Sequence, residues 1–156
     1  LANADLIPLD YQVFAERMEE YLTEAERAWR GSGRAPAGLQ GFTVARSAQR
    51  LLADAAQRIT IRGRVLLERG EDTGLRSLND ALVRAERALL DPAGLPGRPW
   101  YRHQIYAPTF SYEPKVLPAL AEAIETGDAD AVRREEARVA AALTRLAEIL
   151  KIHDSE

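Results

Sequence analysis

The sequence contains no cysteine, so it can form neither a disulfide nor a thiolate metal site, and cysteine usage leaves the redox compartment undetermined. It has only two histidines and no hydrophobic run long enough to span a bilayer. The net charge is −3 and the pI is near 5.5. This acidic balance argues against nucleic acid or an anionic membrane surface as the main partner.

Recognisable catalytic motifs are also missing. Neither Gly-x-Ser-x-Gly nor His-Glu-x-x-His occurs, and the glycines match no phosphate-binding loop. The glutamate pairs Glu19–Glu20 and Glu135–Glu136 are neighbours on predicted helices, so their side chains diverge and we interpret both pairs as solvated faces. The chain is therefore predicted to have no catalytic residue, no metal ligand and no cofactor of its own, and to bind no zinc.

The two histidines lie about fifty residues apart, which is not ligand spacing. His153 falls in the polar C-terminal tail, where a solvated side chain is expected. His103 lies beside Arg102 in an aromatic segment, and two interpretations of it stay open: a ligand or acid–base group, or a side chain that makes one structural hydrogen bond.

What the chain does contain is the composition of an ordinary soluble globular protein, with 46% hydrophobic and 29% charged residues. Its 156 residues suffice for one domain with a buried core. The first residues, LANADLIPLD, include neither an initiating Met nor a basic signal-peptide region. We therefore expect residues 1–156 to form a single domain that is a mature fragment or has been excised from a longer protein.

Helical periodicity dominates the sequence, because apolar residues recur at spacings of three and four. The expected helices run from Asp10 to about Trp29, from Thr43 to Arg69, from about Gly74 to Leu90, from about Lys115 to Glu125 and from about Asp130 to Ile152. Asp10 is the expected N-cap of the first helix, and Gly70 is the expected end of the second. No strand is expected. The predicted fold is all-α: an up-and-down, four-helix-bundle-like domain with a short extra helix.

The same periodicity predicts which side chains are buried. The expected apolar stripe of the first helix is Phe14, Met18, Tyr21, Leu22, Ala25 and Trp29, and that of the second is Val44, Ala48, Leu51, Ala55, Ile59, Leu66 and Leu67. In the third and last helices the expected core residues are Leu75, Leu78, Leu82, Ala85, Leu89, Val132, Val139, Leu143, Leu146 and Leu150. The leucines of the third and last helices are expected to pack together.

The segment Asp91–Pro118 interrupts this pattern as a long crossover loop. It holds six of the eight prolines and half of the ten aromatic residues. Proline fixes φ and removes a donor, so no long helix can run through it, and a flexible linker would not carry so many large rings. Two interpretations stay open: a functional loop, or an Ω-like loop that only covers the end of the core.

Three stretches resemble one family: ANADLIPLDYQVFA, LNDALVRAERALLDPAGLPGRPWYRHQIYAP, and Tyr112 followed six residues later by Pro118. They are similar to the C-terminal helical domain of glutamate carboxypeptidase II and its relatives, among them the transferrin receptor. The similarity spans essentially the whole chain in the same order, and the run ERALLDPAGLPGRPWYRHQIYAP is its most specific part. The chain is thereby identified as a transferrin receptor-like dimerisation domain.

The resemblance implies a non-catalytic C-terminal domain of a zinc exopeptidase-like protein, whose zinc ligands and catalytic glutamate lie in a separate peptidase domain. It implies two partners, a second copy in a homodimer and the parent's own peptidase domain. The acidic charge balance and the lack of a long hydrophobic run separately predict no contact with nucleic acid or membrane. The resemblance favours an exported, periplasmic or extracellular protein, although the residues themselves leave the location unknown.

The resemblance also assigns one pocket position. Tyr112 matches a tyrosine that, together with a lysine before it, holds the carboxylate of the substrate's terminal glutamate, in a loop that forms one wall of the pocket. The lysine that precedes this tyrosine in the family is Ser111 here. A neutral hydroxyl cannot supply the charge-assisted contact, so a preference for acidic C-terminal residues stays open. The alternative for Tyr112 is a ring packed on the end of the bundle.

Two other functions remain as alternatives. In the first, the domain belongs to a receptor or scaffold homologue whose peptidase domain has lost its zinc ligands; in the second, it is a free-standing helical binding module. The coding sequence upstream of Leu1 would distinguish these readings.

Overall fold

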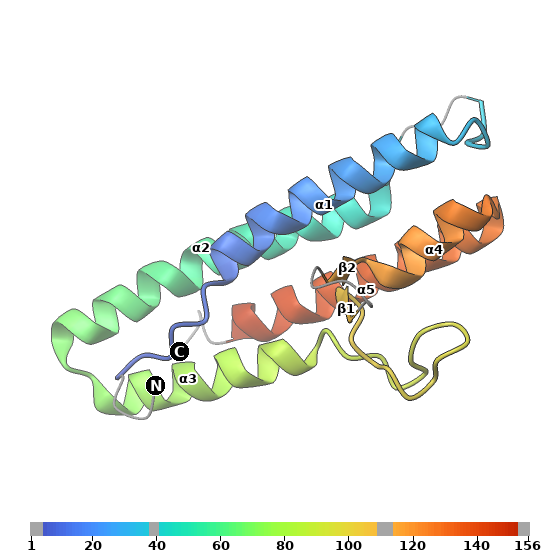
Figure 1. Cartoon of the computed structure of the whole chain (residues 1–156). Coiled ribbons are helices and arrows are strands. Elements are labelled where there is room, and N and C mark those ends of the chain that lie inside the picture. Colours follow the sequence, from blue (N-terminus) through green and yellow to red (C-terminus); the bar gives the residue numbers. More distant parts are fainter. Residues whose placement is uncertain (1–4, 38–40, 109–113, 153–156) are drawn as a thin grey trace.

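The chain forms five helices and one short hairpin within residues 5–37, 41–108 and 114–152, the part that this computed structural model describes (Figure 1). The helices are α1 (Tyr11–Gly31), α2 (Thr43–Arg69), α3 (Asp72–Arg87), α4 (Pro118–Thr126) and α5 (Ala129–Ile152). The hairpin consists of β1 (Tyr106–Ala107) and β2 (Lys115–Val116). The predicted helical bundle is confirmed, and the hairpin is an addition to it.

Local signals set several helix ends as expected. The Oδ1 atom of Asp10 accepts hydrogen bonds from the backbone N–H groups of Gln12 and Val13, both at 3.0 Å, so Asp10 caps α1. Helix α2 ends at Gly70, whose φ of 62° lies in the left-handed region that favours glycine. Helix α3 ends earlier than predicted, because Ala88, Leu89 and Leu90 form successive turns with hydrogen bonds to the third residue before them.

The hairpin corrects the predicted start of the short helix. Lys115 is not helical but pairs with Ala107, while Val116 pairs with Tyr106. Helix α4 begins only at Pro118, because a proline disfavours the helical conformation in the residue before it. That residue, Leu117, is buried and left-handed with φ 45°, and its N–H donates to the Ile105 carbonyl at 2.8 Å.

The helices are arranged in two layers (Figure 1). Helices α1 and α2 lie side by side and antiparallel, and the other layer contains α3, α4 and α5. Helix α5 packs mainly on α2 and also contacts α3 and α4. One large hydrophobic core lies between the layers. The expected packing of the third and last helices is confirmed, because all ten of their predicted core residues are buried in this core: Leu75, Leu78, Leu82, Ala85, Leu89, Val132, Val139, Leu143, Leu146 and Leu150.

The predicted stripe of α2 is partly wrong. Val44, Leu51 and Leu67 are exposed, and the buried face is formed by Ala45, Ala48, Leu52, Ala55, Ala56, Ile59 and Leu66. Small alanines on that face allow neighbouring helices to approach closely. Helix α1 begins only at Tyr11, and Asp10 just before it lines the same apolar hollow as Ile59 of α2. Leu67 lies eight residues further along α2 than Ile59, so α1 does not cover it.

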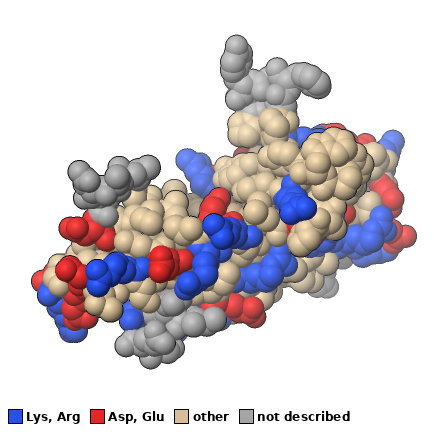
Figure 2. Space-filling view, turned by 90° about the horizontal axis from the view of Figure 1, so that it is seen from below, with Lys and Arg blue, Asp and Glu red and all other residues tan. Residues whose placement is uncertain are grey.

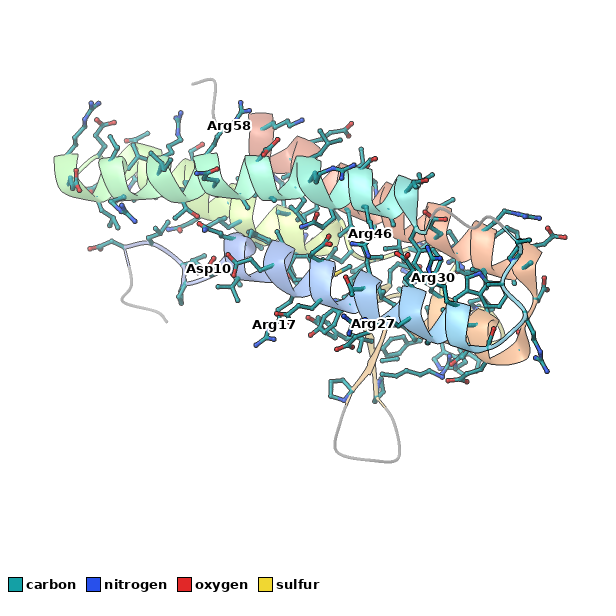
Figure 3. All side chains as sticks on the ribbon, turned by 90° about the horizontal axis from the view of Figure 1, so that it is seen from above. Asp10, Arg17, Arg27, Arg30, Arg46 and Arg58 are labelled. Carbon is teal, nitrogen blue, oxygen red and sulfur yellow. The ribbon has the colours of Figure 1, made fainter. Side chains whose placement is uncertain are left out.

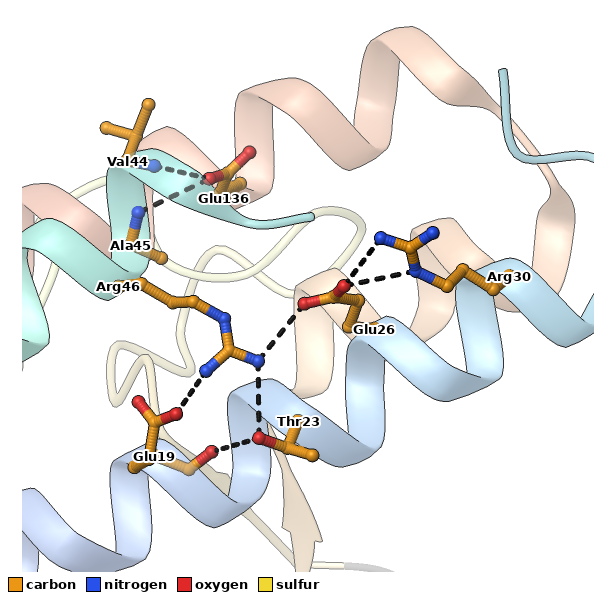
Figure 4. Close-up of polar contacts among 8 residues, drawn as sticks. All are labelled: Glu19, Thr23, Glu26, Arg30, Val44, Ala45, Arg46 and Glu136. Atoms are coloured by element: carbon orange, nitrogen blue, oxygen red, sulfur yellow. Dashed lines mark hydrogen bonds and ion pairs between the residues drawn. The ribbon is translucent and has the colours of Figure 1, made fainter. Parts of the chain in front are cut away.

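Polar side chains connect α1 and α2 (Figure 4). Arg46 of α2 donates hydrogen bonds to Glu19, Thr23 and Glu26 of α1, and Arg30 also donates to Glu26. Burial acts to raise the pKa of Glu26, but hydrogen bonds from Arg30 and Arg46 outweigh it, so the pKa lies below the usual glutamate value.

The interpretation of Glu135–Glu136 as a solvated face is also wrong. Glu135 is only 7% exposed and forms an ion pair with Arg138 at 3.1 Å. Glu136 accepts hydrogen bonds from the N–H groups of Val44, at 3.0 Å, and Ala45, at 3.3 Å, and so caps the start of α2 (Figure 4). The residue before α2, Phe42, makes no side-chain cap. A side chain of α5 therefore performs the capping that the local sequence does not supply.

Candidate functional site: the crossover between α3 and α4

The crossover folds back on its own beginning. The N–H of Asp91 donates to the Arg102 carbonyl at 2.9 Å, and the N–H of Gln104 donates to the Leu89 carbonyl at 3.0 Å. The side chains of Gln104 and Ile105 are buried. The described part of the segment, residues 91–108 and 114–118, is therefore ordered and packed, which excludes a simple solvated linker.

Arg138 of α5 holds the first turn of the crossover. Its Nη2 atom donates to the Asp91 carboxylate at 2.9 Å and to the Gly94 carbonyl. Burial acts to raise the pKa of Asp91, but hydrogen bonds from the Ala93 N–H and from Arg138 outweigh it, so the pKa lies below the usual aspartate value. The ionised carboxylate is thus the form that suits this contact.

The next turn presents a large aromatic side chain. Gly94 has a φ of 69°, and a Cβ atom there would lie 2.4 Å from the Pro99 carbonyl oxygen, so only glycine fits. Leu95 is buried in a small second cluster with Ala107 and Ala119. Trp100, in contrast, is 75% exposed. The crossover therefore combines a buried apolar base with an exposed indole.

His103 fixes the entrance to β1. Its Nδ1 atom accepts hydrogen bonds from the N–H groups of Ile105, at 3.2 Å, and Tyr106, at 3.1 Å, and its Nε2 atom lies 3.8 Å from Oε1 of Glu86. An Nδ1 that accepts must be unprotonated, so the proton of the neutral ring is assigned to Nε2, on the side of Glu86. The geometry favours the structural interpretation of His103. Among the described residues, no three His, Asp or Glu side chains are grouped so as to hold a metal ion.

Tyrosines stabilise the base of the hairpin. The hydroxyl of Tyr101 donates to the Tyr106 carbonyl at 2.8 Å, and the ring of Tyr106 packs edge-on against Tyr21 of α1 with 6.1 Å between the ring centres. Burial, and then a hydrogen bond with Tyr21, raise the pKa of Tyr106 to about 12. Tyr106 therefore stays a neutral phenol at physiological pH. This ring contact between α1 and β1 was not predicted, since no periodic signal connects the two segments.

The predicted pocket residues belong to the segment that joins the two strands. Ser111 and Tyr112 fall in residues 109–113, outside the described part of the chain, and His153 also lies outside it. Next to this segment, Lys115 donates to Glu125 of α4 at 3.0 Å and lies 3.7 Å from Glu122. The structure therefore places the two strands that carry the connection, and the roles of Ser111 and Tyr112 stay predictions.

The charge on the side of α3 and the crossover is mixed. Figure 2 shows this side, where basic and acidic side chains alternate around uncharged areas. Such a face lacks the continuous basic stripe that is typical of a surface binding nucleic acid. Within the described residues, no helix combines the length and the apolar character that crossing a membrane requires.

Comparison with known proteins gives a consistent picture. The sequence profile of the transferrin receptor-like dimerisation domain matches residues 42–151. A probable glutamate carboxypeptidase of Zea mays is 30% identical over 167 residues, covering 100% of this chain and 23% of that protein. A probable glutamate carboxypeptidase of Arabidopsis thaliana is 29% identical over 158 residues, covering 97% of this chain and 22% of that protein.

A third relative has a different description. An inactive zinc metalloprotease of Schizosaccharomyces pombe is 42% identical over 72 residues, covering 46% of this chain and 9% of that protein. The chain therefore spans less than a quarter of the length of each of these three relatives.

Proposed function

The chain belongs to the transferrin receptor-like dimerisation domain family, and from this premise we propose that it is the non-catalytic C-terminal dimerisation domain of a glutamate carboxypeptidase-like zinc exopeptidase. The similarity to the maize relative, which runs through the entire chain but covers only 23% of that protein, carries the proposal. The rest of such a protein would contain the peptidase domain with its zinc. This domain would be one module of that longer chain.

Self-association is the central part of the proposal. Four large aliphatic side chains of α2 remain exposed after the bundle has formed: Val44, Leu51, Ile61 and Leu67. Apolar side chains on a regular helix favour association when they can be covered together. We expect a homodimer whose population rises with concentration, measured by sedimentation velocity over a wide concentration range. One sharp monomer species at the highest concentration would contradict it.

A second role concerns the substrate pocket. Tyr101 and His103 hold the base of the hairpin, so the segment that joins β1 to β2 starts from a fixed support. We propose that Tyr112 in this segment contributes one wall of a pocket formed mainly by the peptidase domain, and that Ser111 leaves this wall without a cation.

The substitution Ser111→Lys in the full-length protein tests this pocket role. It should raise kcat/KM for peptides that end in glutamate relative to peptides that end in alanine, because it adds a charge-assisted contact with the side-chain carboxylate. Tyr112→Phe should lower the same ratio. Equal effects of both variants on the two peptides would argue that the segment does not touch the substrate's last residue.

A non-enzymatic parent is the second candidate. The fission yeast relative is named an inactive zinc metalloprotease, so this type of domain also occurs in a protein described as inactive. Metal analysis of the purified full-length protein distinguishes the two: bound zinc together with peptide hydrolysis supports the peptidase, and a stable dimer without either supports a scaffold. Purification of a stable, full-length product that contains no other domain would instead support a free-standing binding module.

A further inference from the structure

The turn that leads into β1 uses a histidine where the chain elsewhere uses aspartate. Nδ1 of His103 accepts hydrogen bonds from the N–H groups two and three residues later, those of Ile105 and Tyr106. Oδ1 of Asp10 accepts in the same way at the start of α1, and Oδ1 of Asp128 does so at the start of α5, all four bonds being 3.0 Å long. Figure 3 shows Asp10 immediately before the first turn of α1. The same local motif is therefore made by carboxylates at two positions and by an imidazole at His103.

The two kinds of acceptor respond differently to pH. A carboxylate remains an acceptor at all pH values well above about 4, and a hydrogen bond from the Ala131 N–H holds the pKa of Asp128 below the usual aspartate value. A neutral imidazole has a single acceptor nitrogen, and in water it takes up a second proton near pH about 6.5. The charged ring only donates, whichever way it is turned. Mild acid therefore threatens the acceptor at His103 and leaves the carboxylates intact.

The backbone on both sides of His103 fixes the ring in this position. The N–H of Gln104 donates to the Leu89 carbonyl at 3.0 Å, and His103 itself is bridged to Leu90 in antiparallel fashion. The imidazole is 22% exposed, and its ring centre lies 5.7 Å from that of Tyr106. Ile105 is fully buried, so its N–H gains water as a substitute acceptor only when the turn opens.

Glu86 of α3 opposes the effect of acid. Its Oε1 atom lies 3.8 Å from Nε2 of His103, so it attracts the charged form of the ring. This distance exceeds that of a hydrogen bond, and the Glu86 side chain is 54% exposed, which makes the attraction weak. Protonation of Nδ1, in contrast, turns two accepted hydrogen bonds into contacts between donors and leaves a buried N–H unpaired. The loss therefore outweighs the attraction.

The other charged or titratable groups around the ring do not reverse this balance. Tyr106 remains a neutral phenol, because burial and then a hydrogen bond with Tyr21 of α1 raise its pKa to about 12. Arg17 of α1 acts on Tyr106 as a positive charge, and the exposed Arg102 is the neighbour of His103 in the chain. Both cations disfavour a further positive charge on the imidazole.

We infer that His103 makes the hairpin sensitive to protons: a second proton, taken from solvent at Nδ1, releases the N–H groups of Ile105 and Tyr106 and frees β1 from its support. The open turn exposes the imidazole to water and binds more protons than the closed turn. The stability that His103 gives the turn is thus present above pH about 6.5 and is lost as the pH falls. His103 acts here as a positioning residue.

The consequence for substrate binding rests on the proposed function, whereas the opening itself does not. The strand that His103 supports leads into the segment that contains Tyr112. If this segment forms one wall of the pocket, that wall loses its fixed base in mild acid. The opening is measured on this chain alone, without substrate or peptidase domain.

Hydrogen exchange followed by NMR at pH about 7.5 and about 5.5 tests the inference. The protection of each amide is its exchange rate relative to that of an unstructured peptide at the same pH. Protection of the Ile105 and Tyr106 amides should fall by up to about tenfold at the lower pH, because the open turn binds a proton that the closed turn excludes. The Leu143 amide, in the core of α5, should keep its protection and so report that the bundle is unchanged.

His103→Asn is the matched variant. An asparagine side chain accepts from the N–H groups two and three residues later, as Asp10 does, and takes up no proton in this pH range. Its Ile105 and Tyr106 amides should therefore have the same protection at both pH values. In the wild type, the nitrogen spectrum of the labelled imidazole should show an unprotonated Nδ1 at pH about 7.5, and protonation of Nδ1 should accompany the loss of protection.

The outcomes separate the inference from the proposed function. Loss of protection in the wild type but not in His103→Asn supports the inference. Equal protection of the wild-type turn at both pH values, an equal fall in the asparagine variant, or protonation of Nδ1 without loss of protection overturns it and leaves the pocket role untouched. If the turn opens as expected but Tyr112→Phe does not change peptide selectivity in the full-length protein, only the pocket role is overturned.

Discussion

Arg138 of α5 donates to a single oxygen of Asp91 through two nitrogens, Nε at 3.1 Å and Nη2 at 2.9 Å. The two residues are 47 positions apart. Their contact fastens the start of the crossover to α5, the helix that packs mainly on α2. The buried Glu135 accepts a hydrogen bond from Nη1 of the same guanidinium. The crossover is therefore positioned by the bundle and not only by its own turns.

Because of this contact, the free energy of unfolding should fall at acidic pH. The pKa of Asp91 is lower in the folded chain than in the unfolded one, so the carboxylate stabilises the fold fully above the ordinary aspartate pKa of about 3.9. That contribution is lost as the pH falls through the folded-state value. We expect Asp91→Asn to lower the free energy of unfolding at pH about 7 and to flatten its fall toward pH about 3, as measured by urea denaturation.

The matched control for this test is Asp80→Asn, which removes a carboxylate from the exposed face of α3 and leaves the Arg138 contact intact. It should retain the wild-type slope of stability against pH. An identical slope for Asp91→Asn and the wild type would show that the Arg138 contact does not contribute to acid sensitivity.

Truncation of the core should be costly. Leu82 and Leu143 are buried in the same cluster, so Leu82→Ala and Leu143→Ala should each reduce the free energy of unfolding by roughly 2–5 kcal/mol. Val83, which is exposed beside Leu82, provides the comparison: Val83→Ala should change stability by less than about 0.5 kcal/mol. A loss below about 0.5 kcal/mol at Leu82 or Leu143 would be incompatible with the packing described.

The cap on α2 supplied by α5 should be measurable. Glu136→Ala removes the acceptor for the N–H groups of Val44 and Ala45 and should cost about 0.5–2 kcal/mol in thermal or urea denaturation. Glu136→Gln keeps an oxygen acceptor but not the charge, so its loss should be smaller. If the alanine and glutamine variants are equally stable, the hydrogen bonds to α2 are not what Glu136 contributes.

Replacement of His103 should loosen the hairpin locally. His103→Ala leaves the N–H groups of Ile105 and Tyr106 without their acceptor, so their amide protons should exchange faster with solvent, measured by NMR. Arg102→Ala, at the neighbouring exposed position, is the control and should leave both rates unchanged. Unchanged rates in the His103 variant would mean that the imidazole does not hold the hairpin.

Zinc analysis of the isolated chain tests whether the metal belongs to another domain of the parent protein. The tag-free chain should contain far less than one equivalent of zinc by elemental analysis, because its described residues provide no cluster of three ligands. One equivalent of zinc retained after dialysis would contradict the assignment of zinc to another domain.

The sequence by itself determined the features that depend on local interactions. The five helices follow from apolar spacing, the start of α1 from the Asp10 cap, and the end of α2 from Gly70. The leucines of α3 were identified as core because only one apolar line exists on that helix. For the candidate site, the sequence located the crossover and, through the family resemblance, named Tyr112 and Ser111, whose roles remain predictions.

Only the tertiary structure decided the features that depend on distant neighbours. Helix α2 has two apolar lines, and both satisfy helical periodicity; the positions of α1 and α5 bury the line through Leu52 and leave the line through Leu51 in solvent. The two-residue strands are too short to show a period, and Glu135 and Glu136 differ from solvated glutamates only through Arg138 and the start of α2. Local spacing fixes the secondary structure because the interacting groups are close in the chain, whereas burial depends on which surfaces meet after the chain has folded.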